Sequence, residues 1–383
     1  MAYDLQNKSI VNEIVDYSIY QIGKLGLSPL TVHQVATCLA RFVDFLLTEN
    51  ITYLQVHDGI LAKFRDKELR VIVGTELLSH VSNDAIMRAK STVNQKMQAV
   101  LAWLCWLADT GRLPSYMIGP HHKLITLESK IVTRGSSSRQ YTLSKLSSPV
   151  LFTRISRSTG QRVGRTPQDE QLTEIKNFLA SETDSTYIKR RNLLLFDIAI
   201  TTGFRRASIS SLRCAQFNRE EILFATEEYI SLRPDKQKFS YGNEFQISTE
   251  LALRILEYIE GPLTYFCLDK RVGVGVANSR LFLSEKNGMP LDDRSITAIF
   301  SKAMRQAGMP KGCSIHALRR RFADEEIVKV ILFRLQHGLD TSAISIAQEV
   351  AQKLGHRSLE SITAYVSSNQ SRLLASGMKK VDF

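Results

Sequence analysis

Apolar residues recur at intervals of three and four in two long stretches near the start of the chain. One stretch covers residues 28–50, beginning with Ser-Pro-x-Thr, and the other covers residues 91–113, ending around Gly111. This spacing puts the apolar side chains on one face of a helix. Ser28 can cap the first helix, and glycine commonly ends one. Residues 1–126 are therefore predicted to form a small helical domain.

Several polar residues lie toward the N-terminal end of the second predicted helix, away from most of its apolar stripe. A face of this kind is ordinarily solvated, but it can also approach a DNA groove. The sequence leaves both interpretations open, and it makes the two lysines candidate DNA contacts. The residues are Lys90, Asn94, Gln95, Lys96 and Gln98.

Residues 127–165 differ in composition from the chain on either side. They are rich in Ser, Gly and Thr. They contain several basic residues but one acidic residue, Glu128. This composition predicts a linker. Basic linkers are usually solvated, but one that joins two domains can also wrap a polyanion. Its candidate DNA contacts are Arg139, Arg154, Arg157 and Arg162.

A second domain is predicted over residues 166–383. Thr166 can cap a helix whose first position is Pro167, and a buried helix follows at 190–204. Residues 221–249 contain β-prone runs interrupted by turn signals, which indicates a small antiparallel sheet. Helical patterns then return. The predicted fold class is mainly α with a small antiparallel β-sheet (α+β).

Charge and cysteine usage narrow the function classes. The chain has 50 Lys+Arg against 38 Asp+Glu, a net charge of +12, which favours polyanionic partners without proving one. Its 5 cysteines are scattered, without metal-ligand spacing, and fit reduced thiols. Apolar runs are broken by charges and the start lacks a secretory pattern, so no membrane span or partner membrane is expected.

Two clusters of polar residues on apolar scaffolds can bind a phosphate. In TTGFRR, residues 201–206, Arg205 follows a helix end, where its guanidinium can bind a phosphate or serve as an exposed cap. In SIHALRRRFADEE, His316 and Arg319 are three residues apart and share one helix face. Arg320, beside them, is a candidate contact to the DNA backbone.

Two further clusters supply reactive groups. Lys236 and Lys238 lie between two β-prone runs, where a lysine is normally an edge guard. In LGHRSLESITAY, residues 354–365, His356 precedes Tyr365 by nine residues. Cutting a phosphodiester without a metal needs cations around the nonbridging oxygens, a nucleophile and a proton donor. The arginines, Tyr365, and a lysine or histidine can meet these needs.

The boxes TTGFRR, HALRRRFA and LGHRSLESITAY resemble, in this order, the arginine box, the His-x-x-Arg box and the tyrosine box of the tyrosine recombinase (phage integrase) family. The resemblance is specific over about residues 165–370. The N-terminal helices are more loosely similar to the SAM-like core-binding domain that these recombinases place on the other face of DNA.

The resemblance implies a role for each matched residue. Arg205 and Arg319 would clamp the scissile phosphate, and His356 would hydrogen-bond it. Tyr365 would attack phosphorus, with His316 assisting proton transfer. The roles imply a 3′-phosphotyrosyl link and a free 5′ hydroxyl, with no cofactor, metal or ATP. The proton donor to the departing 5′ oxygen would be Lys236, with Lys238 as the second choice.

Two features depart from the family pattern. The position three residues after the first arginine usually carries an acid, and here it is Ser208, which can form hydrogen bonds but brings no charge. Residues 327–345 make the interval between Arg319 and His356 longer than expected, which predicts a lengthened or added helix.

The resemblance implies a site-specific recombinase acting on double-stranded DNA with specific recombination sites. It implies a Holliday junction, a homotetramer on DNA and a monomer or dimer off it. The C-terminal residues would dock on the next subunit, or pack on their own domain. Accessory or co-recombinase proteins, integration or excision of a mobile element, and a bacterial cytoplasmic, nucleoid-associated location are further expectations.

Three alternatives remain open at the level of sequence. A type IB topoisomerase would use the same chemistry as a monomer. A noncatalytic or accessory DNA-binding member of the fold would account for Ser208. A metal-dependent nuclease is suggested by Asp235 ahead of Lys236, but the chain lacks a well-placed Glu-x-Lys partner.

Overall fold

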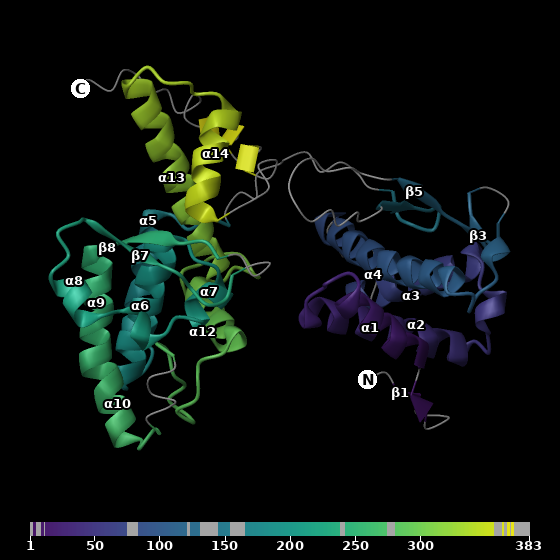
Figure 1. The fold of residues 1–383 in the computed structure, drawn as a ribbon, viewed down its shortest axis with the longest axis horizontal. Coiled ribbons are helices and arrows are strands. Elements are labelled where there is room, and N and C mark those ends of the chain that lie inside the picture. Colours follow the sequence, from purple (N-terminus) through teal and green to yellow (C-terminus); the bar gives the residue numbers. More distant parts are fainter. Residues whose placement is uncertain are drawn as a thin grey trace. The chain divides into compact units, whose positions relative to one another are not determined.

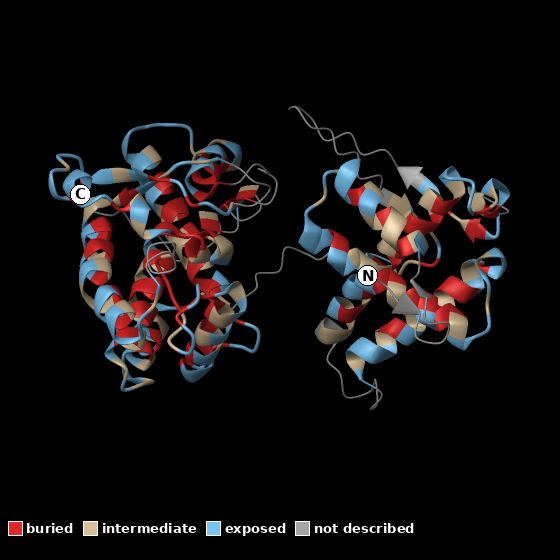
Figure 2. Cartoon of the chain, turned by 60° about the horizontal axis from the view of Figure 1, so that its bottom comes forward, coloured by how far each residue is buried: buried red, intermediate tan, exposed pale blue. Residues whose placement is uncertain are grey.

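The computed structural model divides the chain into two compact units, Met1–Ser156 and Arg157–Phe383. Each unit has its own buried core, as the colouring in Figure 2 shows. The structure describes residues 3–4, 9–10, 12–74, 83–120, 123–130, 145–153, 165–237, 242–273, 280–355, 362–363, 366–367 and 369–370.

The described residues of the first unit contain four α-helices, α1 to α4 (Figure 1). The apolar faces of the helices meet in a core that includes Phe42, Phe64 and Trp103, with the Phe42 and Phe64 rings 5.0 Å apart. Short strand pairs complete the unit. The helices are α1 (Asn12–Gly23), α2 (Pro29–Thr48), α3 (Asp58–Val73) and α4 (Asn83–Asp109); the strands are β1 (Tyr3–Asp4), β2 (Ser9–Ile10), β3 (Ile118–Gly119), β4 (Ile125–Thr126), β5 (Glu128–Lys130) and β6 (Lys145–Ser147).

Local signals set the helix ends. Ser28 accepts a hydrogen bond from the Thr31 amide at the start of α2, where Pro29 is the first helical residue. Helix α4 ends at Asp109, close to the left-handed Gly111 (φ 72°), but it starts eight residues before the predicted position 91. The expectation that no segment could cross a bilayer was too broad. Helix α2 is long and apolar enough to cross a membrane by length and composition alone. Core helices of soluble proteins meet the same criterion.

Part of the predicted linker packs on the first unit. Strand β5 pairs antiparallel with β6, and Val150 is buried in the helical core. The Asn94 amide of α4 both donates to the carbonyl and accepts from the amide of Phe152, each at 2.9 Å. Gln98 donates to the Leu146 carbonyl at 2.7 Å. Asn94 is thus buried and Gln98 half-buried, and both bond to the main chain of residues 146–152, which cover this part of α4.

In the described part of the second unit, further helices pack around α6, together with the hairpin of β7 and β8. Its two strands pair antiparallel, with Ile230 opposite Ile247. The predicted fold class, mainly α with a small antiparallel sheet, is confirmed. The elements are α5 (Asp169–Ser181), α6 (Thr186–Thr202), α7 (Arg206–Ser210), α8 (Arg219–Leu223), β7 (Tyr229–Leu232), β8 (Phe245–Ser248), α9 (Thr249–Tyr258), α10 (Thr264–Asp269), α12 (Asp293–Gln306), α13 (His316–Gln336) and α14 (Ala343–Leu354).

The long interval after Arg319 forms a helical pair. Helix α13 continues to Gln336. The chain then turns at the left-handed Gly338, and α14 packs back against α13 (Figure 1). The two helices enclose a separate small core that includes Ile327, Ile346 and Val350. Several large apolar side chains on the outside of this pair remain exposed, including Leu332, Phe333, Leu335, Leu339 and Ile344.

Candidate functional site

Arg319 connects three segments that are far apart in the sequence. It lies in the first turn of α13 and is 6% exposed. One end of its guanidinium donates to the carbonyl of Gly203, which follows α6, and the other donates to the carbonyl of Leu354, the last residue of α14, at 2.8 Å. Helix C-termini carry unpaired carbonyls and a partial negative charge. Two helix ends thereby hold one buried cation.

Both helix ends turn through a left-handed glycine. Gly203 and Gly355 each have φ 59°, a conformation in which an L side chain is strained. A Cβ at Gly203 would also run into the ring of Phe322, and one at Gly355 would lie 2.9 Å from the ring of Phe245. These glycines let two helices stop abruptly, so that their last carbonyls point at Arg319.

The second arginine of the site lies close to Arg319. Arg205 is the N-cap residue of α7, two residues beyond Gly203, and is partly buried. Burial, followed by the charge of Arg205, lowers the pKa of Arg319 to about 9. The two guanidinium groups repel one another, and a bound phosphate would offset that repulsion. His316, the first residue of α13, is exposed one turn before Arg319.

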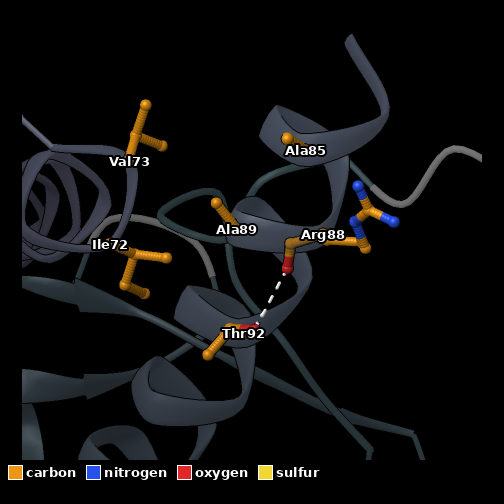
Figure 3. Close-up of a pocket in the computed structure, with 6 residues that line it drawn as sticks. All are labelled: Ile72, Val73, Ala85, Arg88, Ala89 and Thr92. Atoms are coloured by element: carbon orange, nitrogen blue, oxygen red, sulfur yellow. Dashed lines mark hydrogen bonds between the residues drawn. The ribbon is translucent and has the colours of Figure 1, made fainter. Parts of the chain in front are cut away.

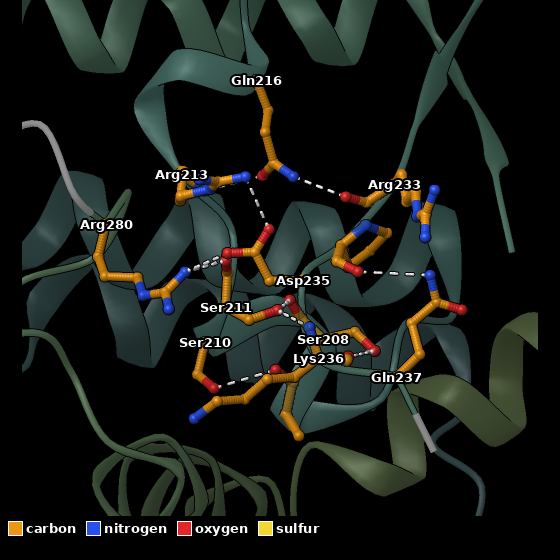
Figure 4. A network of polar contacts seen from close by, with 12 residues as sticks. Ser208, Ser210, Ser211, Arg213, Gln216, Arg233, Asp235, Lys236, Gln237 and Arg280 are labelled. Carbon is orange, nitrogen blue, oxygen red and sulfur yellow. Dashed lines mark hydrogen bonds and ion pairs between the residues drawn. The ribbon is translucent and has the colours of Figure 1, made fainter. Parts of the chain in front are cut away.

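Lys236 follows strand β7, and its side chain is exposed. Its main chain is held by two serines of the α7 region (Figure 4). Ser208 donates to the Lys236 carbonyl at 2.9 Å, and the Lys236 amide donates to the hydroxyl of Ser211 at 2.9 Å. Ser208 stands at the position where the family usually carries an acid, and here it bonds to the segment that holds Lys236.

The carboxylate ahead of Lys236 is paired with arginines. Asp235 forms ion pairs with Arg213 at 3.0 Å and with Arg280 at 2.8 Å. Both of its oxygens are thus engaged in fixing this segment, which argues against the nuclease alternative. No group of three or more His, Cys, Asp or Glu residues suited to a metal occurs in the described parts of the chain.

Several predicted residues lie outside the described residues. These are His356, Tyr365, Lys238, Arg139, Arg154, Arg157 and Arg162. The sequence neighbours of the first two are described. Gly355, directly before His356, adjoins the carbonyl that binds Arg319, and Val366, directly after Tyr365, is buried in the core between α13 and α14.

The remaining candidate DNA contacts have different surroundings. The Lys96 ammonium forms a 2.5 Å ion pair with Glu68, whose side chain is buried and also binds Arg41. The Lys90 ammonium lies 5.5 Å from the centre of the Phe152 ring. Arg320 is partly buried on α13. Its neighbour Arg321 forms ion pairs with Asp169 and Glu325, so it ties α13 to the start of α5.

A pocket of about 230 Å³ lies in the first unit, between the end of α3 and the start of α4 (Figure 3). Its walls are mostly apolar, and none of the predicted site residues lines it. The lining residues are Ile72, Val73, Ala85, Arg88, Ala89 and Thr92.

Sequence reasoning missed the residues that fix the lysine segment. Ser211 ends the run SISS, residues 208–211, shortly after the arginine box; such serines often hydrogen-bond to main-chain groups, which was an available signal for a positioning role. Arg280 carries no local signal, since its partners Asp235 and the Ser211 carbonyl are distant in sequence.

The site unites two arginines, a hairpin lysine and the ends of two helices on a mainly helical domain. The model of the phage integrase family matches residues 168–372, more than half of the chain. The chain belongs to the phage integrase family, the tyrosine recombinases.

Solved structures share the fold. The XerH site-specific recombinase bound to palindromic difH substrate, in a post-cleavage complex, is 17% identical with TM-score 0.56, covering 99% of this chain and 91% of that one. The Tn1549 transposon integrase in complex with transposon right end DNA is 12% identical with TM-score 0.50, covering 96% and 99%. Comparison with curated proteins gave no match.

Proposed function

We propose that this protein is a site-specific DNA recombinase that cleaves and rejoins DNA strands through a 3′-phosphotyrosyl intermediate. The observation that carries the proposal is the position of Arg319, which bonds to the carbonyl after α6 and to the carbonyl before Gly355. One buried arginine of the second box thus bonds to Gly203 of the first box and to Leu354, the first residue of the third. Family membership supports the reaction class, and the XerH and Tn1549 complexes support DNA as the partner.

In this proposal Arg205 and Arg319 bind the nonbridging oxygens of the scissile phosphate. The pKa of Arg319 is lowered to about 9 by burial and by Arg205, so its charged form is costly in the empty site. A phosphate between the two guanidinium groups offsets that cost and gains charge-assisted hydrogen bonds. His356 adds a further hydrogen bond to the phosphate.

The reaction exchanges one phosphodiester for another. The phenol oxygen of Tyr365 attacks phosphorus while His316 assists removal of its proton. The bond between phosphorus and O5′ breaks, its electron pair stays on O5′, and the Lys236 ammonium supplies a proton there. The products are a 3′-phosphotyrosyl link and a free 5′ hydroxyl.

Rejoining is the same step in reverse, with a 5′ hydroxyl from a second strand as the nucleophile. Because the phosphotyrosyl link keeps the bond energy, neither ATP nor a divalent metal is needed. Two rounds of strand exchange between paired sites pass through a Holliday junction, and four active sites call for a homotetramer on DNA. Off DNA the protein is a monomer or dimer.

The biological role proposed is integration or excision of a mobile element, with accessory or co-recombinase proteins setting direction. The location proposed is the bacterial cytoplasm, with the protein on the nucleoid when bound to DNA. The net charge of +12 favours binding that weakens steeply as salt is raised.

A covalent-trapping assay tests the proposal. Purified protein is incubated without metal with nicked fragments of DNA from around its own gene, then denatured and resolved from free DNA. An adduct that forms with the wild type and is lost in Tyr365→Phe supports the recombinase. Tight, salt-sensitive DNA binding without any adduct would favour the noncatalytic DNA-binding alternative.

A further inference from the structure

Two serines and Lys236 form a closed set of hydrogen bonds. The Ser208 hydroxyl donates to the Lys236 carbonyl at 2.9 Å. The Lys236 amide donates to the Ser211 hydroxyl at 2.9 Å, and that hydroxyl donates to the Ser208 carbonyl at 2.8 Å. Both polar groups of the Lys236 main chain are therefore satisfied by α7 and the residue that follows it.

This arrangement is buried, although the lysine it holds is not. Ser208 is 6% exposed and Ser211 is 1% exposed, while Lys236 is exposed. Hydrogen bonds in such a setting are costly to lose, because a buried polar group is left without a partner.

Neighbouring contacts fix the chain on both sides of Lys236 (Figure 4). Asp235 is paired with Arg213 and Arg280, and Arg280 also donates to the Ser211 carbonyl at 2.6 Å. Gln237 donates to the Asn243 carbonyl at 2.7 Å. The base of the Lys236 side chain is thus held in a fixed position relative to α7, the helix that Arg205 caps.

We infer that Ser208 and Ser211 are positioning residues that set Lys236 against the phosphate held by Arg205, and that position 208 requires a hydroxyl donor. The inference rests on the proposed function, in which Lys236 protonates the departing oxygen. The inference assigns a role to the serine that replaces the family's usual acid at position 208. In this chain, hydroxyl groups align the lysine.

The chemistry of the bond explains why an acid cannot replace the serine. The atom that Ser208 faces is a carbonyl oxygen, which accepts hydrogen bonds and donates none. An ionised carboxylate also only accepts, so Ser208→Asp would bring two acceptors together in a buried place. Restoring the residue type usual in the family should therefore misplace Lys236 rather than improve the enzyme.

The test compares two DNA substrates that differ in one atom. In the first, the leaving atom is the ordinary 5′ oxygen, which needs a proton from Lys236. In the second, a 5′ sulfur replaces it, and the thiolate leaves without a proton. A residue that acts through Lys236 matters for the first substrate alone, whereas a residue needed for folding or phosphate binding matters for both.

Three variants are measured by the rate of adduct formation. Because a positioned general acid contributes about 10²- to 10⁴-fold, Ser208→Ala should slow cleavage of the oxygen substrate about 10- to 100-fold, and Ser208→Asp should slow it further. Both should cleave the sulfur substrate within about threefold of the wild type. Ser210→Ala is the matched control, since Ser210 lies on α7 but its hydroxyl donates to Asp293 at 2.6 Å.

Amide hydrogen exchange at Lys236 provides a readout that does not depend on catalysis. Its amide should exchange faster in Ser208→Ala and Ser208→Asp than in Ser210→Ala, because the bonded set is broken. Unchanged exchange, equal slowing on both substrates, or a Ser208→Asp protein as active as the wild type would overturn the inference. Faster exchange without any Tyr365-dependent adduct in the wild type would instead count against the proposed function.

Discussion

The guanidinium of Arg319 donates a hydrogen bond to the carbonyl oxygen of Gly203. These residues are 116 positions apart, and each belongs to a different box of the family pattern. Gly203 must adopt a left-handed conformation to end α6 there, and Arg205 follows two residues later. The bond therefore couples the positions of Arg205 and Arg319. A substitution at Gly203 should displace both arginines.

Gly203→Ala should destabilise the second unit. A left-handed alanine and the displaced Phe322 ring together cost about 2–5 kcal/mol of unfolding free energy. Gly308→Ala is the matched control: Gly308 has φ 68°, but its Cβ would meet open space. That change should cost about 1–2 kcal/mol. Urea unfolding measures both, and equal losses would contradict the role given to the Phe322 contact.

Local signals predicted much of this fold, and pairings over long distances account for what they missed. The start of α2 at Ser28 and Pro29 and the hairpin of β7 and β8 follow from capping and turn residues. Residues 146–152 of the predicted linker, however, pack on the first unit, because Asn94 binds the main chain of Phe152. The spacing of apolar residues along the chain cannot predict a hydrogen bond between side chain and main chain 58 positions apart.

The same reasoning applies to the site. Order and spacing selected Arg205, His316 and Arg319, and in the structure the charge of Arg205 acts on Arg319 and lowers its pKa. The bond from Ser208 to Lys236 was not predictable, since a serine hydroxyl has many possible partners and the hairpin position depends on tertiary packing. The catalytic roles of all six matched residues stay predictions from the family pattern; they are Arg205, Lys236, His316, Arg319, His356 and Tyr365.

Asn94→Ala should release residues 146–152 from α4. The change removes two hydrogen bonds and leaves the Phe152 amide and carbonyl without this partner, which costs about 1–3 kcal/mol. Gln95→Ala, at an exposed neighbouring position, should change stability by less than about 0.5 kcal/mol. Hydrogen exchange of the 146–152 amides and urea unfolding check the result. Equal behaviour of the two variants would show that this contact contributes nothing.

The two α4 lysines should separate into a structural and a DNA-binding role. Lys96→Ala leaves the buried Glu68 with Arg41 as its ion-pair partner, so it should lower stability by about 1–3 kcal/mol with little effect on the salt dependence of DNA binding. Lys90→Ala should leave stability nearly unchanged and reduce the salt slope of binding by about one. Thermal unfolding measures the stability of both variants, and binding titrations at several salt concentrations measure their salt slopes. A loss of stability in Lys90→Ala with a reduced salt slope in Lys96→Ala would contradict this division.

Three thiols should react slowly at neutral pH. Burial raises the pKa of Cys38, Cys105 and Cys214 to about 11 each. Alkylation of the native protein should therefore accelerate as the pH approaches 11. Because the folded pKa lies above the unfolded value, these thiols favour the folded state below pH 9 and lose that effect between pH 9 and 11. Rapid labelling at pH 7, followed by mass spectrometry, would contradict this expectation.

The bond between Tyr365 and DNA is the most direct test of the central claim. Protein trapped on cleaved DNA is digested with nuclease and trypsin, and the nucleotide-bearing peptide is sequenced by mass spectrometry. We predict that the link is to the tyrosine within residues 358–372, through a 3′ phosphate, with a free 5′ hydroxyl on the other strand end. The adduct should be absent from Tyr365→Phe. A link at another residue, a 5′ phosphate in the adduct, or an adduct that survives Tyr365→Phe would contradict the account.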